Sequence, residues 1–369
     1  MEGDVSCECV SSMNRVSLNL CKKLSEKDEN VFLSGYSISV ALTMLIMGCN
    51  NHSYNELKDF MGWTKEENEM ISSCKTICER LTSTRGIQLY SGNSVWAQEL
   101  RNDYIQRVQS DLGATAFPLK SEKEINSWTS QKTQGLIDEI VKELPSPCLG
   151  VLVNAIYFKG TWFNSFPVRS TMPGEFFLLN NSTIQVPTMR LTEYFNSCIF
   201  SSHGMTIVEL PYEGKKYSMV LVLPSPDQTW HEFKNIPNNE LLSLFNQLQI
   251  QKLTVTLPKF KKDSEIIDLK STLEDHFNIT TIFDYKKADL SRLSNNPLIE
   301  VSNIFHRAVC NVNETGTEAA AATAVVMGRG RGRPVPVPTI RFNRPFFYAI
   351  RNIPSNLLLF CGYLMEPKQ

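Results

Sequence analysis

One segment near the carboxyl end constrains the fold of this 369-residue chain more than any other feature. Residues 314–338 begin with small side chains, continue as a Gly/Arg run and end in alternating prolines. The prolines forbid a regular helix and favour an extended exit from the segment. The part from Thr317 to Val326 fits a helix by its alanines or a strand by its Thr and Val residues. Because a long stretch without regular structure is uncommon in a compact domain, we expect this segment to be functional or disordered.

The rest of the chain changes from helix-rich to strand-rich. Apolar residues recur at helical spacing from residue 13 to 24, and Ser37 is placed to cap a second helix. Further helical stretches are expected over residues 54–62, 66–80 and 121–143. Strands are expected over residues 151–158, 184–189, 206–212, 216–223, 252–257 and 357–364. This order, without a repeat or a linker, predicts one α+β domain spanning residues 1–369.

Charge and motif content exclude several function classes. The 37 Lys and Arg residues balance 38 Asp and Glu residues, so no global field attracts nucleic acid or an anionic membrane. The sequence lacks Gly-x-Ser-x-Gly, His-Glu-x-x-His and a Walker loop, and its five histidines lie in no nucleophile or metal motif. We therefore expect no enzyme, no cofactor and no metal site.

Cysteine usage and the amino terminus bear on the cellular compartment. The 10 cysteines are dilute and mostly lie in apolar runs, which favours buried structural thiols over a disulfide framework. Cys74 and Cys78 share one face of an expected helix, but no second pair with zinc spacing follows. The start is acidic and precedes no apolar run, and no run of 18 apolar residues occurs. We expect neither a cleaved signal peptide nor a membrane span.

The small residues after Gly316 suggest what the long segment does. A stretch with side chains no larger than Thr or Val can insert between two strands, because little volume has to be buried. Gly316 permits unusual backbone angles at a pivot. Each backbone hydrogen bond gained contributes about 0.5–1.5 kcal/mol net. Insertion of ten or so residues would therefore release a large amount of stored free energy.

These residues resemble the hinge of the serpin family, and the resemblance extends over the whole chain. The hinge match is Gly316-Thr317-Glu318-Ala319-Ala320-Ala321-Ala322-Thr323. Other family motifs, in chain order, resemble Asn30-Val31-Phe32-Leu33-Ser34 with Ser37-Ile38, Ile125-Asn126-x-Trp128 with Thr133-x-Gly135-x-Ile137, Leu152-Val153-Asn154-Ala155-Ile156-Tyr157-Phe158-Lys159-Gly160-x-Trp162, Leu257-Pro258-Lys259-Phe260, Ala288-Asp289-Leu290-Ser291 and Phe342-Asn343-Arg344-Pro345-Phe346. The missing leader makes the chain look like the ovalbumin-like branch.

The resemblance implies a serpin fold of about nine helices and three sheets with an exposed reactive-centre loop, approximately residues 314–338. It implies a hinge of Glu314 and residues Gly316 to Ala322, with Thr317 the first side chain to enter the large sheet. It implies a breach containing Trp162 and Lys259, where insertion begins. Ser34, Ser37, Asn154 and His306 match the family's shutter, although each could be a buried polar residue with one hydrogen-bond partner. Gly35, in place of the usual proline, is expected to loosen its helix.

The Gly/Arg run supports two interpretations. As bait, an arginine fits the acidic specificity pocket of a trypsin-like protease. Family spacing counted from either end brackets Arg331, so the cut is expected at Arg331-Gly332, with Arg329-Gly330 second. Alternatively, Arg331-Gly332-Arg333-Pro334 is similar to an AT-hook that lies in a narrow A·T minor groove. The flanks add no further basic residues, which argues against DNA.

The resemblance implies a monomeric inhibitor that traps a trypsin-like serine protease covalently. A non-inhibitory serpin, with or without DNA binding, is the alternative. We expect no membrane partner and do not expect nucleic acid. The location implied is cytoplasmic, or extracellular by a leaderless route.

Overall fold

The computed structural model describes residues 7–81, 86–263, 265–317 and 336–368. Within these ranges the chain forms nine α-helices, which agrees with the expected number. The helices are α1 (Cys7–Leu24), α2 (Gly35–Gly48), α3 (Asn51–Met61), α4 (Glu67–Arg80), α5 (Asn102–Leu112), α6 (Glu122–Lys132), α7 (Trp230–Lys234), α8 (Asn238–Leu244) and α9 (Lys270–Phe277). No helix in the described part of the chain has the length and apolar character needed to cross a bilayer.

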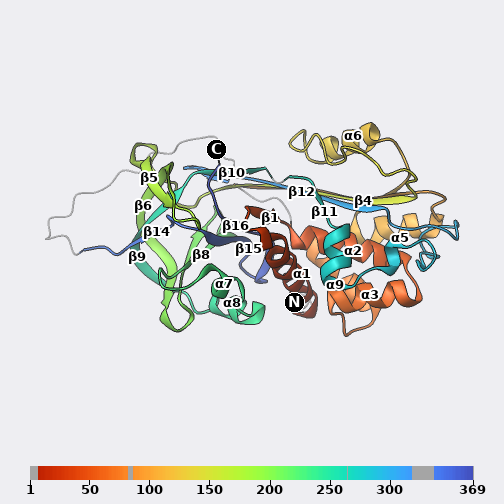
Figure 1. Ribbon diagram of the computed structural model, residues 1–369, viewed down its shortest axis with the longest axis horizontal. Helices are drawn as coiled ribbons and strands as arrows, with labels where there is room; N and C mark the ends of the chain where they lie inside the picture. The colour runs from red at the N-terminus through yellow and green to blue at the C-terminus, as the bar shows by residue number, and fades with distance from the viewer. Residues whose placement is uncertain (1–6, 82–85, 264, 318–335, 369) are drawn as a thin grey trace.

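The large sheet has the strand order β10-β12-β13-β4-β2-β3, with β11 paired to β12. Its strands are β2 (Ile87–Ala97), β3 (Thr115–Pro118), β4 (Gly150–Thr161), β10 (Phe260–Asp263), β11 (Ile267–Asp268), β12 (Asn303–Val312) and β13 (Gly316–Thr317). The central strand β4 is almost entirely buried, which explains its nearly continuous apolar sequence. In Figure 1 this sheet runs across the molecule, with α6 on one side and α2 on the other.

The second sheet has the order β1-β16-β15-β8-β7-β6-β9-β14, with β5 paired to β6. Its strands are β1 (Val31–Leu33), β5 (Met172–Phe177), β6 (Thr183–Phe200), β7 (Met205–Pro211), β8 (Tyr217–Pro224), β9 (Gln249–Pro258), β14 (Thr339–Arg341), β15 (Phe346–Asn352) and β16 (Leu357–Leu364). Two of the three expected sheets are therefore joined, and the described residues form two sheets in total. The reason is β6, whose 18 residues pair with β5 and β9 and then continue along β7.

The start of α2 differs from the sequence expectation. Ser34, not Ser37, is the N-cap, and its hydroxyl accepts a hydrogen bond from the Ser37 N–H at 3.1 Å. A β-carbon on Gly35 would lie 2.0 Å from the Ser17 hydroxyl of α1. Gly35 thus permits the close approach of two helices, while the Ser34 cap fixes the helix start.

The expected helix over residues 121–143 is too long. Helix α6 begins with a capping box between Ser121 and Glu124 and ends at Lys132. Gln134 and Gly135 follow with φ of 55° and 76°, and two consecutive left-handed residues end a right-handed helix. The segment after them continues without helix to β4.

The ten cysteines are all free, as their arrangement predicted. Cys49, Cys74 and Cys361 are fully buried, whereas Cys7 is exposed and Cys198 is partly buried. The described residues contain no group of three or more His, Cys, Asp or Glu side chains placed to hold a metal ion.

Candidate functional site

The bait segment is only partly described. Residues 314–317 and 336–338 have a defined place, whereas the expected hinge residues Glu318, Ala319, Ala320, Ala321 and Ala322 lie outside the described residues. The expected cleavage residues Arg329, Gly330, Arg331 and Gly332 also lie outside them. The site is therefore built from the two ends of the segment and from the sheet that receives its first residues.

Gly316 and Thr317 already lie in the large sheet, as strand β13 between β4 and β12. Thr317 is opposite Val312 on one side and Gly160 on the other, and it is fully buried. Its hydroxyl is 2.7 Å from the Tyr212 hydroxyl. Thr317 was expected to enter when the loop inserts; in this structure its insertion has already taken place.

Gly316 is required by the close approach of β4. A β-carbon there would lie 2.0 Å from the Gly160 carbonyl oxygen and 2.8 Å from Thr161 Cα. No ordinary side chain contact is that short, so any larger residue would push β13 away from the strand. The glycine therefore allows the chain to turn directly into the gap between β4 and β12.

A tight turn from Asn313 to Gly316 reverses the chain between β12 and β13. The Asn313 side-chain oxygen accepts hydrogen bonds from the Thr315 N–H at 3.0 Å and the Gly316 N–H at 3.2 Å. The Trp162 indole N–H donates to the Asn313 carbonyl at 2.9 Å, and its ring stacks on Tyr212 with centroids 4.6 Å apart. Sequence reasoning identified Trp162 but missed Asn313, which acts through a local turn, and Tyr212, whose partner Thr317 is distant in the sequence.

Glu314 and Lys259 form an ion pair on the outer side of this turn. Lys259 Nζ is 3.0 Å from one carboxylate oxygen, and the Thr171 hydroxyl donates to the other at 2.8 Å. Burial alone would raise the pKa of Glu314, but hydrogen bonds to its carboxylate and the Lys259 charge lower it overall. The carboxylate is therefore ionised at neutral pH and fixes the turn to Lys259, which joins β9 to β10, and to Thr171. Because Lys259 is about one-third exposed, the pair contributes only about 1 kcal/mol.

Beyond the short strand β13, the large sheet has no gap between β12 and β4. β12 and β4 pair directly in parallel, from Asn303 opposite Val151 to Val309 opposite Tyr157. Further entry of the loop would require these two strands to separate along their length. Hydrogen bonds lost between β12 and β4 would be replaced by two new ladders, one on each side of the inserted strand.

Four polar residues meet beneath this closed pair of strands. His306 on β12 lies directly opposite Asn154 on β4, and their side chains hydrogen-bond through His306 Nδ1 and Asn154 Oδ1. His306 Nε2 accepts the Ser34 N–H at 3.1 Å. The Asn154 amide donates to the Ser37 carbonyl at 3.0 Å. The structure thus brings all four expected shutter residues together, with Ser34 at the N-cap of α2 and Ser37 in its first turn held against the strands.

The geometry fixes the charge state of His306. Since Nε2 accepts a backbone N–H, the ring proton is on Nδ1 and is donated to Asn154. Burial lowers the pKa of His306 to about 3, despite a small opposing contribution from Asn154. The ring is therefore neutral at physiological pH, and a second proton would cost the bond to Ser34.

Asn93 is a fifth member of the cluster that sequence reasoning missed. It lies on β2 opposite Asn154, accepts a hydrogen bond from the Asn154 amide, and lies 3.4 Å from the Ser37 hydroxyl. No motif marks it, because its role depends on the register between β2 and β4. The cluster therefore connects α2 to three strands of the large sheet.

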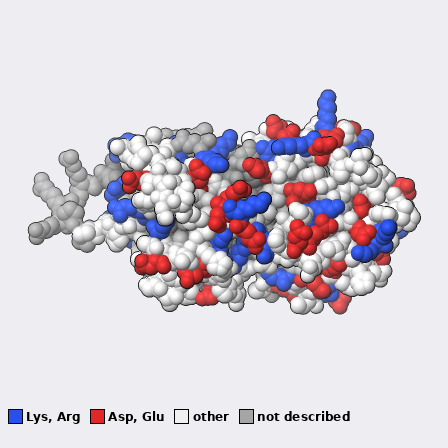
Figure 2. Space-filling model, viewed as in Figure 1, with Lys and Arg blue, Asp and Glu red and all other residues white. Residues whose placement is uncertain are grey.

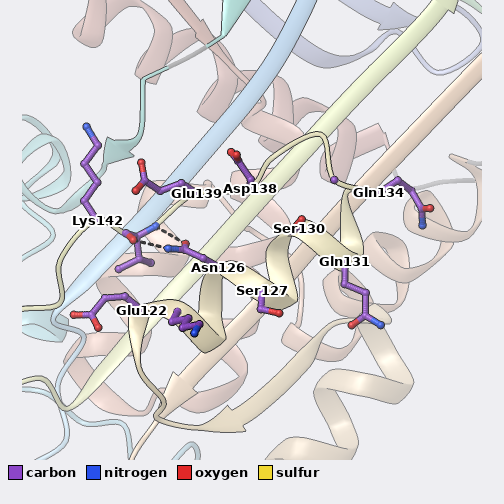
Figure 3. A pocket seen from close by; sticks show the side chains of 12 residues that line it. Glu122, Asn126, Ser127, Ser130, Gln131, Gln134, Asp138, Glu139 and Lys142 are labelled. Atoms are coloured by element: carbon purple, nitrogen blue, oxygen red, sulfur yellow. Dashed lines mark hydrogen bonds between the residues drawn. The ribbon is translucent and has the colours of Figure 1, made fainter.

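The opposite face of the same strands is covered by α6 and the segment that follows it. Ile125, Ile137 and Ile140 pack with residues of both β4 and β12. Figure 3 shows Asn126 reaching this segment; its oxygen accepts the Ile140 and Val141 N–H groups at 2.9 and 3.0 Å. The hollow in that view is open and lined by polar side chains without a catalytic arrangement. Separation of β4 from β12 must therefore disturb the α6 contacts.

The carboxyl end of the bait segment is fixed on the other sheet. The Pro338 carbonyl accepts the Thr254 N–H at 2.8 Å, and β14 then pairs in parallel with β9. One end of the segment thus lies in the large sheet and the other beside β9, so the residues between them connect two separate sheets.

Comparison with known proteins gives a consistent family assignment. The family model described as "Serpin (serine protease inhibitor)" matches residues 11–367. Iripin-8 from Ixodes ricinus is 32% identical, with 95% of this chain and 91% of the relative covered. Human Serpin B10 is 27% identical, with 97% of this chain and 99% of the relative covered. The latter similarity agrees with the ovalbumin-like branch.

Solved structures show the same architecture. Human thyroxine-binding globulin complexed with thyroxine superposes with a TM-score of 0.89 at 25% identity, covering 98% of this chain and 100% of that one. The thermophilic serpin Tengpin in its native state gives a TM-score of 0.88 at 26% identity, with 97% and 94% covered. The expected α+β serpin fold is therefore confirmed.

Proposed function

The chain belongs to the serpin family, whose members are mostly protease inhibitors rather than enzymes, and we propose that it inhibits trypsin-like serine proteases as a suicide substrate with an arginine bait. The observation that supports this most directly is the position of β13. Gly316 and Thr317 lie at the entrance between β4 and β12, while the strands below remain paired. Glu318 follows, and the next four residues are alanines, which an opened sheet can accept with little volume to bury.

The proposed reaction begins as ordinary proteolysis. The protease serine attacks the carbonyl carbon of Arg331, the bond to Gly332 breaks, and the new Gly332 amine takes the proton from the protease histidine. The remaining ester links the protease to the part of the loop that starts at Gly316. Water would hydrolyse this ester unless insertion between β4 and β12 first carries the protease away from its docking position.

Strand addition supplies the driving force in this proposal. Roughly ten new backbone hydrogen bonds at about 0.5–1.5 kcal/mol each would give about 5–15 kcal/mol in total. Separating β12 from β4 and displacing contacts of α6 opposes insertion. The polar cluster of His306 and Asn154 holds β4 and β12 paired until the loop is cut; we call this pairing of β4 with β12 the seam.

A denaturing gel after incubation with trypsin tests the inhibitory function. A covalent band at the summed mass is expected, and the amino terminus of the released fragment should be Gly332. Arg331→Ala should abolish the complex, whereas Arg329→Ala is the matched control and should retain it. A fragment starting at Gly330 would instead assign the cut to Arg329. Complete degradation without a complex at any ratio would contradict inhibition.

A second function is supported by the AT-hook-like residues Arg331-Gly332-Arg333-Pro334. The chain would then be a non-inhibitory serpin that binds A·T-rich DNA, and a thyroxine-binding member of the fold illustrates a serpin with a ligand-carrying role. Salt-sensitive binding to an A·T-rich duplex, lost in Arg331→Ala, would favour this function. Ten free thiols favour a reducing compartment for either function, which supports the cytoplasm over the leaderless extracellular route.

A further inference from the structure

Three strands beside the carboxyl end of the bait segment present an outward basic surface. On β6, β9 and β14, Arg190, Thr256 and Arg341 lie side by side in one row of the ladders. Four residues further along β6, Tyr194 lies opposite Lys252, whose ammonium group is 5.8 Å from the centre of the Tyr194 ring. Residues directly opposite one another project from the same face of a sheet, as do alternate residues along a strand. We call Arg190, Lys252, Arg341 and Tyr194 the basic face.

The cations of the basic face have no carboxylate partners among the described residues. Arg190, Lys252 and Arg341 are exposed and take part in no ion pair. Glu193, the nearest acidic residue on β6, occupies the alternate position opposite the buried Leu253 and therefore belongs to the other side of the sheet. Figure 2 shows Lys and Arg side chains gathered at the left end of the molecule, where Figure 1 places β6, β9 and β14.

Large apolar side chains accompany these charges. Tyr194 is 62% exposed, and Ile250, opposite Asn196 on the same face, is 74% exposed. Exposed aromatic residues and arginines are enriched in protein–protein interfaces. Their combination with unpaired cations fits an acidic protein surface.

The bait segment brings its target over this face. Pro338 is the seventh residue after Arg331, so the two lie at most about 25 Å apart even when the chain is fully extended. A protease domain of about 200 residues has a radius of gyration of roughly 16 Å and is about 40 Å across. A protease whose active site holds Arg331 therefore has that active site within about 25 Å of Pro338, and its body is large enough to reach β14, which begins immediately after Pro338.

We propose that the basic face docks an acidic surface of the target protease and accelerates its capture by the bait. This inference rests on the proposed inhibitory function. Complementary charge raises association rates and suppresses mismatched partners, and its effect weakens with salt. Nucleic acid is a poorer occupant, because DNA-binding proteins typically engage about 6–10 phosphates, and three cations provide fewer contacts.

Anionic and cationic trypsin are suitable probes, because both cleave after arginine and they differ in surface charge. At low salt, the wild-type protein should form its covalent complex about tenfold faster with anionic trypsin, and high salt should remove the difference. Arg190→Glu combined with Arg341→Glu should abolish or reverse this preference without changing inhibition stoichiometry. Heat-unfolding midpoints would verify that the surface variants fold.

The matched control makes the same change in net charge elsewhere. Lys27 lies at the end of the 3-10 helix Ser25–Lys27, and Lys286 follows the 3-10 helix Thr281–Phe283; both are exposed and outside the two sheets. Lys27→Glu combined with Lys286→Glu should retain most of the wild-type preference. If the preference for anionic trypsin falls as far in this control as in the Arg190/Arg341 variant, net charge rather than the basic face controls the rate, and the proposal is wrong.

The remaining outcomes separate the two levels of inference. Normal complex formation with unchanged rates in the Arg190/Arg341 variant would overturn the basic face and leave the inhibitory function intact. If the wild-type protein forms no complex with either trypsin, both the inhibitory function and the docking proposal are contradicted. Heparin binding that the variant loses, together with unchanged trypsin rates, would assign the face to a polyanion and also overturn docking of a protease.

Discussion

His306 should make the stability of this protein sensitive to mildly acidic pH. Burial lowers the pKa of His306 to about 3, whereas an unperturbed histidine titrates near 6.5. Between these values the unfolded chain binds one proton more than the folded chain, so stability rises with pH and is lost as pH falls below about 6.5. The loss is about 1.4 kcal/mol per pH unit, which gives about 2 kcal/mol at pH 5 and about 4 kcal/mol by pH 3.

The structural origin of this effect is specific. The groups in hydrogen-bonding contact with the ring, the Ser34 N–H and the Asn154 amide, carry no charge that could stabilise an imidazolium. A second proton on Nε2 would replace an acceptor with a donor facing the Ser34 N–H. Acid should therefore weaken the seam between β4 and β12 before it affects exposed parts of the chain.

His306→Gln removes the titrating group, and His52→Gln on the exposed start of α3 is the matched control. Urea unfolding followed by tryptophan fluorescence at pH 7.5 and pH 5 gives the free energy of the first transition. The variant should lose about 2 kcal/mol less than the wild-type protein between these pH values, while His52→Gln should behave as wild type. Equal losses in the wild-type protein and His306→Gln would refute a neutral, proton-resistant His306.

Three further variants test the entry of the loop. Thr317→Arg places a charged side chain where Thr317 is fully buried against Tyr212, at a cost of about 3–5 kcal/mol. Trypsin should therefore cleave the variant as a substrate, at an unchanged association rate. An inhibition stoichiometry equal to that of the wild-type protein would contradict the assignment of Thr317 to the hinge. Gly316→Ala directs a β-carbon against the Gly160 carbonyl and should cost about 1–3 kcal/mol, measured from heat unfolding. Trp162→Phe removes one buried indole hydrogen bond and should lower the free energy of urea unfolding by about 0.5–1.5 kcal/mol; no change would show that the bond is not stabilising.

Several elements could be predicted from the sequence because local pattern decides them. The apolar run at residues 151–158 became β4, and the apolar residue spacing from Met13 became α1. β2 and β12 were missed, because both mix polar residues such as Asn93 and His306 into their apolar pattern. Their strand character comes from pairing with β4 on either side of the seam, which no local window contains.

The candidate site divides in the same way. Ser34, Ser37, Asn154 and His306 could be named in advance through a family resemblance, and Glu314 with Lys259 likewise. Asn313 and Tyr212 could not, because Asn313 acts through a turn and Tyr212 through a neighbouring sheet. The basic face was equally invisible, since Arg190, Lys252 and Arg341 lie far apart in the sequence.

By itself, the sequence determined the composition of the bait segment. It has small residues that can enter a sheet, arginines after which a trypsin-like protease can cleave, and prolines that prevent a helix. Only the tertiary structure decided how far the segment enters. Gly316 and Thr317 are strand because β4 and β12, more than 140 residues apart, present two edges at the spacing of one inserted strand. Strand pairing is a long-range interaction, so Gly316 and Thr317 form a strand only when both edges are in place, whatever their local preference.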